Sequence, residues 1–422
     1  MGGIPRENRK NWTGFSGKRI NIHIISRHDA AEEPCGMQER SKMAEEFKIP
    51  EGIPGEMKAM VEAVLAVRFP ELSGEPESGK WYRISPEGCV TSTGTPWHAT
   101  FRKGEENRLI IQFGGGGVSW SEYMAARPMK LVKGEEQQFY FPDTGWAADA
   151  QVHQGICLKG INNPFSDWSV LVLPYSSGDF HCGTGDFPYT ALDGTGKVLH
   201  HHGYTNYRKA MEAVLRIVPE PERILVCGES AGGFGTALLT DDVMGLYPKC
   251  RDVICCVDSA LTRKEDWGKT AAEVWKAPKE IAECLQSDNL TLDMLKALHR
   301  KRDSRVKILF LCSVRDMALT EMQDYIHTGR MKADRAAADI FQANLLEMCR
   351  QMRQEIPGCG LFIFDKVMPG TDEEAHLTVH TILMENLVYE TLECGCSAME
   401  WLWRAVQGEI VSYGTELCEK TV

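Results

Sequence analysis

The stretch ILVCGESAGGFG, residues 224–235, is the most informative part of this chain for its fold class. Four apolar residues typical of a buried strand lead into the pentapeptide GESAG, and a run of small and apolar residues typical of a helix follows. In a G-x-S-x-G elbow, a nucleophilic serine lies at a sharp strand-to-helix turn, where small flanking residues let the backbone fold tightly. Ser230 is therefore a candidate nucleophile, although a strand–helix turn with an incidental serine has the same appearance.

Short segments rich in Ile, Val, Leu and Phe recur along the chain, with helical patterns between them. These segments are 108–113, 168–175, 223–228, 252–259, 306–314 and 360–370, and the clearest helical stripes are 206–218, 338–356 and 397–408. The apolar segments are too uniformly apolar for half-exposed strands, so they predict a parallel sheet that is covered on both faces. Strands that alternate with helices predict an α/β-hydrolase-like fold with a mostly parallel sheet, helices on both faces, and loop and helical insertions.

The domain organisation is predicted to be simple. The 422 residues are long enough for two or three domains of ~100–200 residues each, yet no repeat or low-complexity linker divides them. We expect one α/β-hydrolase-like esterase domain over residues 46–422, with a helical cap at 262–304. Residues 1–45 are expected to form a poorly ordered extension, and Met43 is a plausible alternative start within it.

Composition limits the partners and the compartment. The net charge of −12 argues against nucleic acid as the main partner, because phosphate binding needs a basic surface. No stretch approaches the ~20 apolar residues of a membrane span, and the first 30 residues do not resemble an export signal. The 15 cysteines are scattered, several of them inside apolar segments, which is typical of a reduced, cytoplasmic protein.

A second glycine-rich element follows the segment 108–113. Gly114–Gly117 come directly after this predicted strand, where backbone N–H groups approach a ligand without interference from side chains. A serine hydrolase needs such donors for its oxyanion, together with the N–H of the residue after the nucleophile, which is Ala231. A phosphate-binding loop would require a following GK[ST] sequence, which is absent, and a plain flexible turn remains the other alternative.

The remaining members of a triad are expected after Ser230, in the order acid and then histidine. Asp316 follows the segment 306–314 and is the preferred acid. Asp258 is the second candidate, with the alternative role of holding the backbone of a loop.

The choice of the general base is open on the residues alone. His376 and His380 both follow the last predicted strand, and Thr371 with Glu374 predicts a capping box that starts a helix there. Four residues apart on a helix, the two imidazoles would share a face and resemble a metal pair. No zinc-protease pattern links them, so we prefer a triad to a metal site.

Four motifs in order resemble the pectin acetylesterase/Notum family of carboxylesterases. They are NPF (163–165), PYSSGDFHCG (174–183), HHGYTN (201–206) and GESAGG (228–233), and the resemblance extends over about residues 110–410. It implies an α/β-hydrolase-type fold, a Ser-His-Asp triad, and removal of acyl groups from acetylated polysaccharide or from a lipidated protein.

Position by position, the resemblance assigns roles to individual residues. It implies Ser230 as nucleophile, Asp316 as acid and, through HTIL (380–383), His380 as base; the oxyanion donors are Gly116, Gly117 and Ala231. The chain departs from extracellular relatives at Ser119 and Ser176, where they often have Cys, which agrees with a reduced cytoplasmic protein.

Further candidates for substrate binding have equally plausible structural roles. Trp120 is a candidate wall of the acyl pocket or a core residue, Asp179 and His181 line the site or hold a turn, and Tyr204 lies in HHGYTN. The run His200–His202 is compatible with metal or substrate binding, although we prefer a solvated lead-in to a helix.

The sequence thus predicts a serine carboxylesterase that acts on acyl esters, preferably acetyl esters of carbohydrate alcohols. The alternatives are a Notum-like lipid O-deacylase, a thioesterase or peptidase with the same triad, and a non-catalytic binding protein. We expect a small-molecule or oligosaccharide ester as substrate, no cofactor, no metal, and neither nucleic acid nor membrane as partner. The oligomeric state is not predicted.

Overall fold

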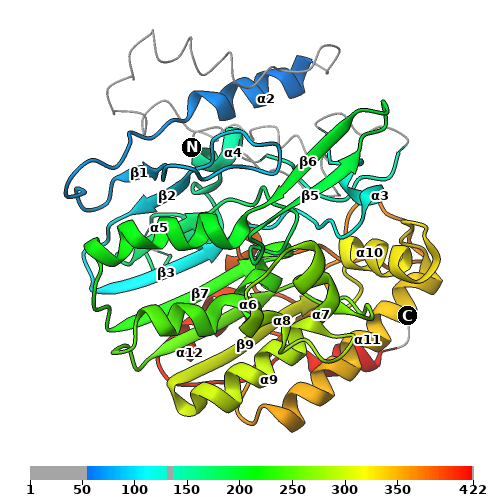
Figure 1. Ribbon diagram of the computed structural model, residues 1–422. Coiled ribbons are helices and arrows are strands. Elements are labelled where there is room, and N and C mark those ends of the chain that lie inside the picture. Colours follow the sequence, from blue (N-terminus) through cyan, green and yellow to red (C-terminus); the bar gives the residue numbers. More distant parts are fainter. Residues whose placement is uncertain (1–54, 131–135, 144, 161, 421–422) are drawn as a thin grey trace, which may run out of the picture.

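The computed structural model describes residues 55–130, 136–143, 145–160 and 162–420 (Figure 1). The predicted extension, residues 1–45, and the alternative start at Met43 lie outside the described residues. The boundary between extension and domain therefore stays a prediction. None of the described helices is long and apolar enough to cross a membrane.

Eight strands form one mixed sheet in the order β1-β2-β4-β3-β7-β8-β9-β10. The strands are β1 (Trp81–Ile84), β2 (Ala99–Arg102), β3 (Arg108–Phe113), β4 (Ser169–Leu173), β7 (Arg223–Glu229), β8 (Val253–Asp258), β9 (Val306–Ser313) and β10 (Gly360–Phe364). The six strands from β4 to β10 pair in parallel, and β1 and β2 join the edge in antiparallel register. Each of these six corresponds to one of the apolar segments, so the predicted parallel sheet is confirmed.

Helices cover both faces of the sheet (Figure 1). They are α2 (Gly55–Ala66), α3 (Glu122–Ala125), α4 (Gly145–Gln151), α5 (Gly203–Ile217), α6 (Ala231–Leu246), α7 (Trp267–Lys269), α8 (Lys279–Ala282), α9 (Leu290–Arg302), α10 (Met317–Thr328), α11 (Arg335–Glu355) and α12 (Ala398–Val406). Short turns of helix are η1 (Gly155–Cys157), η2 (Thr270–Val274), η3 (Asp303–Arg305), η4 (Asn386–Tyr389) and η5 (Thr415–Glu419).

The alternation of side chains along each strand explains why the segments are uniformly apolar. Ile224 and Val226 of β7 belong to the core on one face, with residues of α5, α6, α9 and α11. Leu225 and Cys227, their neighbours on the same strand, belong to the core on the other face, with α12 and η1. A strand that is buried on both sides needs an apolar residue at every position.

Two predictions of local structure are wrong. No helix starts at Thr371: its hydroxyl donates to the carbonyl of Met368, and residues 371–380 form turns and loop. The run His200–His202 is not a solvated lead-in: His200 and His201 end strand β6 (Gly196–His201), which pairs with β5 (Gly185–Thr190) in a hairpin, and His201 is fully buried. Only His202, the N-cap of α5, leads directly into the helix. A local turn replaces the helix at Thr371, and pairing with β5 decides the structure at His200 and His201.

The junction of β7 and α6 is closely packed against β3. A Cβ atom at Gly232 would overlap the carbonyl oxygen of Phe113, and one at Gly228 would overlap the carbonyl oxygen of Gly232. Both glycines are therefore required for β3, β7 and α6 to approach each other.

We expect Gly232→Ala to lower the free energy of unfolding by at least about 2 kcal/mol, because the new methyl group displaces the backbone of β3. Gly245→Ala is the matched control: it lies on the same helix, with nothing within 4 Å of its added Cβ. The control is expected to be neutral or stabilising by up to ~1 kcal/mol, since alanine has the higher helix propensity. Urea unfolding of both variants checks this, and equal losses would contradict it.

Candidate active site

Ser230 occupies the turn between β7 and α6. Its backbone has φ 55° and ψ −123°, a conformation that residues other than glycine rarely adopt. The Ser230 N–H donates to the carbonyl of Asp258 at 2.9 Å, and the Ser230 carbonyl accepts from the Phe234 N–H at 3.1 Å. These bonds hold the strained residue in place, as expected for a serine presented by an elbow.

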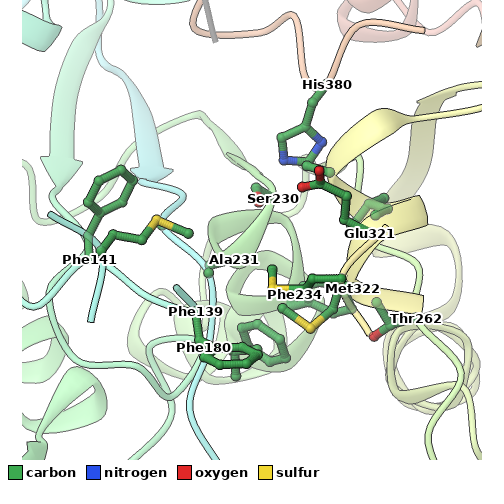
Figure 2. A pocket seen from close by; sticks show the side chains of 17 residues that line it. Phe139, Phe141, Phe180, Ser230, Ala231, Phe234, Thr262, Glu321, Met322 and His380 are labelled. Atoms are coloured by element: carbon green, nitrogen blue, oxygen red, sulfur yellow. The ribbon is translucent and has the colours of Figure 1, made fainter. Parts of the chain in front are cut away.

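Ser230 lines a cavity of about 70 Å³ at the carboxyl ends of the central strands. Figure 2 shows His380 on the same side of this cavity as Ser230, with Phe180 and Met322 further away. The other lining side chains are largely apolar: Met129, Phe139, Phe141, Phe180, Phe234, Leu319, Met322 and Met331. A nucleophile and an imidazole thus share one mostly apolar space.

His380 is paired with Asp316. The Nδ1 atom of His380 lies 2.8 Å from Oδ2 of Asp316, and the aspartate is fully buried. The other oxygen of Asp316 accepts the N–H of Leu319 at 3.0 Å, so Asp316 is also the N-cap of α10. The carboxylate is held from two sides, which fixes the plane of the imidazole beside it.

The structure places His376 in a different environment. Its Nε2 atom lies 2.7 Å from Oδ1 of Asp365, and His376 is not among the residues that line the cavity. Because residues 371–380 are not helical, the spacing of four does not bring the two imidazoles onto one face. His380, and not His376, is the histidine that the structure brings to the cavity of Ser230.

Asp258 has a structural position next to the same loop. Its Oδ2 atom accepts the N–H groups of Ile382 and Leu383 at 2.8 and 2.9 Å, directly after His380. The neighbouring Ser259 donates its hydroxyl to Oδ1 of Asp258 and accepts the N–H of Thr381 at 3.3 Å. We call Asp258 and Ser259 the loop clamp, because together they bind three consecutive N–H groups.

The electrostatics of Asp258 reflect its burial. Loss of solvation raises the pKa of this fully buried carboxyl to about 6, although the N–H groups of Leu383 and Ile382 and the Ser259 hydroxyl favour the charged form. The charge of His380 also lowers the pKa of Asp258, which places the clamp within electrostatic reach of the imidazole.

The glycine loop after β3 is anchored on both sides. Glu229, the residue before Ser230, accepts the N–H of Gly115 at 3.0 Å and the side-chain amide of Gln112 at 2.6 Å. On the other side, Nε2 of His181 lies 2.8 Å from the carbonyl oxygen of Gly114. Glu229 therefore couples the loop to the elbow. Sequence reasoning missed this role, because the second position of G-x-S-x-G, which Glu229 occupies, is variable.

The three predicted oxyanion donors lie together. Gly116, Gly117 and Ala231 all line the cavity of Ser230. Within the described part of the chain, the structure gives their N–H groups no hydrogen-bond partner. Gly117 has φ 76°, and a Cβ atom there would overlap the carbonyl oxygen of Phe139, so only glycine fits. The arrangement can receive a developing negative charge on an oxygen.

The structure does not bring the other predicted substrate-binding residues to this cavity. Asp179 is fully buried and accepts N–H groups of its own loop and of Gly203. Tyr204 donates its hydroxyl to Asp242 at 3.0 Å. Trp120 packs edge to face on Trp267, with ring centroids 5.6 Å apart.

Glu321 on α10 is a cavity residue that the sequence analysis did not identify. Figure 2 shows its carboxylate directed toward His380. Glu321 lies in the second turn of α10, the helix whose N-cap is Asp316. A negative group here favours neutral substrates over anionic ones.

The loop clamp generates a pH prediction for Asp258→Asn. Because burial raises the pKa of Asp258 to about 6, the folded chain binds this proton more tightly than the unfolded chain. As pH rises from about 4 to 6, the wild type should therefore lose up to about 3 kcal/mol of unfolding free energy, which the asparagine variant keeps.

Urea unfolding at pH 4.5, 5.5 and 7 measures the free energy of unfolding of wild type and variant, and the two proteins are compared at each pH. A gap between wild type and variant that stays constant across the three pH values would contradict the prediction.

Comparisons with known proteins agree with this geometry. A family model described as Pectinacetylesterase matches residues 91–270, which include the glycine loop, Ser230 and Asp258. The solved structure of the Wnt deacylase Notum from Drosophila covers 77% of this chain and 93% of its own, with 13% identity and a TM-score of 0.50. No curated protein matches the sequence. The α/β-hydrolase-like fold and the resemblance to the pectin acetylesterase family, over residues 91–270, are thus confirmed.

Proposed function

We propose that this protein is a serine carboxylesterase that removes short acyl groups, preferably acetyl, from carbohydrate alcohols. One observation carries the proposal: the Asp316–His380 pair and Ser230 reach one cavity, which is also lined by Gly116, Gly117 and Ala231. The substrate is a small-molecule or oligosaccharide ester.

In the first step, the hydroxyl oxygen of Ser230 attacks the ester carbonyl while His380 accepts its proton. Asp316 keeps the ring oriented and stabilises the imidazolium that forms. The carbonyl oxygen takes up the negative charge beside the N–H groups of Ala231, Gly116 and Gly117, where one donor contributes roughly 3 kcal/mol.

In the second step, the intermediate collapses and the alcohol leaves with the proton from His380. The acyl group remains on Ser230 as an ester. A water molecule then gives its proton to His380 and attacks the acyl carbon, and the carboxylic acid leaves as Ser230 regains its proton. His380 alternates between base and acid, which its buried pairing with Asp316 supports.

The size of the cavity supports a short acyl group. Its volume of about 70 Å³ is less than half of that of an engineered apolar cavity of ~150 Å³ that binds benzene. Phe180 and Phe234 stack with ring centroids 4.2 Å apart, and Met322 lies beside them in Figure 2. These side chains limit the depth available to an acyl chain.

The second candidate function is removal of a longer acyl chain. The Notum structure is named as that of a Wnt deacylase, so deacylation of a protein belongs to the same class of reaction. The apolar lining of the cavity favours an acyl group over a peptide side chain, and methionines at its wall are adaptable. The same apolar lining would also suit a thioesterase that uses the same triad. The lipid deacylase differs from the proposed enzyme in the length of the acyl chain, and the thioesterase differs from it in the leaving group.

We also propose that the protein works in a reducing compartment such as the cytoplasm. The fourteen described cysteines all have free thiols, and most of them are buried in the core. Such an enzyme would encounter oligosaccharide esters in preference to polymeric ones.

The first test is hydrolysis of 4-nitrophenyl acetate by wild type and by Ser230→Ala. We expect kcat to fall by about 10⁴-fold or more, because the acyl-enzyme cannot form. A fluorophosphonate should label the wild type once and the variant not at all.

The two histidines provide a matched pair for the same assay. His380→Ala should lower kcat about as strongly as Ser230→Ala, since the two residues act as one unit. His376→Ala should remain within a few-fold of wild type, because its partner is Asp365. Equal losses in both histidine variants would contradict the assignment of the base.

Chain length is tested with acetyl, butyryl and octanoyl 4-nitrophenyl esters. We expect kcat/KM to fall by roughly tenfold or more from acetyl to octanoyl, and Met322→Ala to restore part of this loss by deepening the cavity. Met399→Ala, a buried methionine on α12 at the opposite face of the sheet, is the control for destabilisation alone. An octanoyl preference in the wild type would favour the lipid-deacylase alternative.

A further inference from the structure

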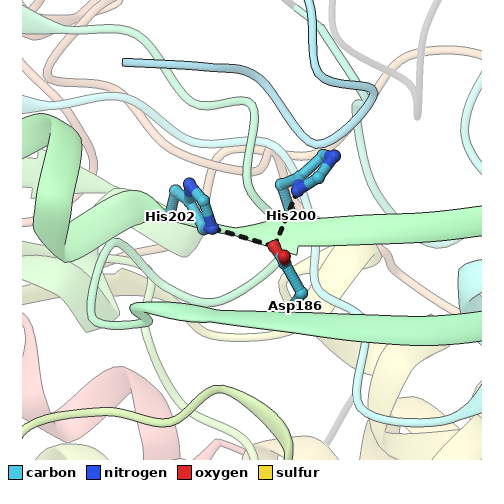
Figure 3. Close-up of side chains that lie close together, drawn as sticks. All are labelled: Asp186, His200 and His202. Carbon is cyan, nitrogen blue, oxygen red and sulfur yellow. Dashed lines mark hydrogen bonds and ion pairs between the residues drawn. The ribbon is translucent and has the colours of Figure 1, made fainter. Parts of the chain in front are cut away.

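Two imidazoles and one carboxylate converge on the β5–β6 hairpin, away from the cavity of Ser230. Asp186 of β5 lies directly opposite His200 of β6 in the strand register, and His202 follows two residues later. Figure 3 shows both rings directed at the carboxylate from above the hairpin. The Nδ1 atom of His200 is 2.7 Å from Oδ1 of Asp186, and the Nε2 atom of His202 is 2.9 Å from the same oxygen.

These three atoms have the chemistry and spacing of a transition-metal site. Two imidazole nitrogens and one carboxylate oxygen are ligands that zinc accepts, with bonds of about 2.0–2.2 Å. A tetrahedral ion at that distance needs ligand atoms about 3.3 Å apart. The three ligand atoms all lie within 4.8 Å of one another, so only small side-chain shifts are needed.

The position of the ligands explains how the site would be preorganised. Asp186 and His200 are fixed by the pairing of β5 with β6, and His202 is the residue that begins α5. A two-stranded hairpin is marginally stable without further support. The side chain of Val198, on the outer part of this hairpin, is 43% exposed, so little packing covers that end. A shared ion would join both strands to the helix.

We propose that Asp186, His200 and His202 bind one divalent transition-metal ion, with zinc as the best match, which cross-links the hairpin to α5. This revises the sequence expectation of no metal, which did not consider Asp186. The ion has a structural role here, because its ligands do not line the cavity of Ser230. The fourth position is left for water.

The competing explanation is a hydrogen-bonded set without metal, in which both imidazoles donate to Asp186. The chain offers a matched example of that arrangement in His376 and Asp365, which are also 2.7 Å apart but have one imidazole only. Asparagine in place of His200 and glutamine in place of His202 place an amide N–H near the same oxygen, yet they ligate zinc poorly. They separate hydrogen bonding from metal binding.

The experiment titrates the chelator-treated full-length protein with Zn²⁺ alone, by isothermal titration calorimetry in thiol-reducing buffer. We expect one zinc equivalent to be lost, or its affinity to fall at least 100-fold, in the double variant His200→Asn, His202→Gln. His376→Asn should bind as the wild type does. Zinc should also raise the melting temperature of the wild type but not that of the double variant.

Two results would overturn the proposal. The first is a wild type that binds no zinc, which would identify the cluster as a hydrogen-bonded set only. The second is unchanged stoichiometry and affinity in the double variant, which would assign the zinc to other residues, such as the partly buried thiols of Cys284, Cys359 and Cys394. Circular dichroism of each variant establishes that the hairpin substitutions leave the fold intact, so a loss of binding reports on the ligands.

Discussion

The whole site depends on one backbone constraint, the turn from β7 into α6 within a single residue. Gly228 and Gly232 allow this turn because any side chain there would overlap a neighbouring carbonyl group. Ser230 then takes a strained conformation, held by its N–H bond to the carbonyl of Asp258 at the end of β8. The same turn directs Glu229 toward the glycine loop, so Ser230 and the proposed oxyanion donors are positioned together.

Three buried carboxylates around this turn perform different tasks, and their hydrogen-bond partners distinguish them. Asp316 pairs with an imidazole and caps a helix, Glu229 accepts from the glycine loop, and Asp258 accepts backbone N–H groups of the loop that carries His380. Only Asp316 contacts an imidazole, whose charge it would stabilise in the proposed reaction. The other two use their oxygens to fix backbone, which is how a loop without secondary structure keeps a catalytic geometry.

The sequence predicted those features that local pattern controls. Uniform apolar runs identified the six parallel strands, because a strand that is buried on both faces needs an apolar residue at nearly every position. The choice between His376 and His380, by contrast, depended on the path of an irregular loop, and the predicted helix there was wrong. Likewise, nothing in the sequence around Glu229 indicated its bond to Gly115, since that contact spans 114 residues. Asp186 was overlooked because its partners lie across a hairpin.

Burial also explains why the proposed metal site differs from the catalytic one. Asp316 and Asp258 are fully buried. Their carboxylate oxygens already accept hydrogen bonds from the protein, so they are not available to an added ion. The side chain of Asp186 is 58% exposed, and water or a cation can reach its oxygens. A cation can exchange with the imidazole protons only where ligands are both convergent and accessible. In this fold, the solvent-accessible ligands lie at the hairpin, and the buried, preorganised side chains lie at the turn from β7 into α6.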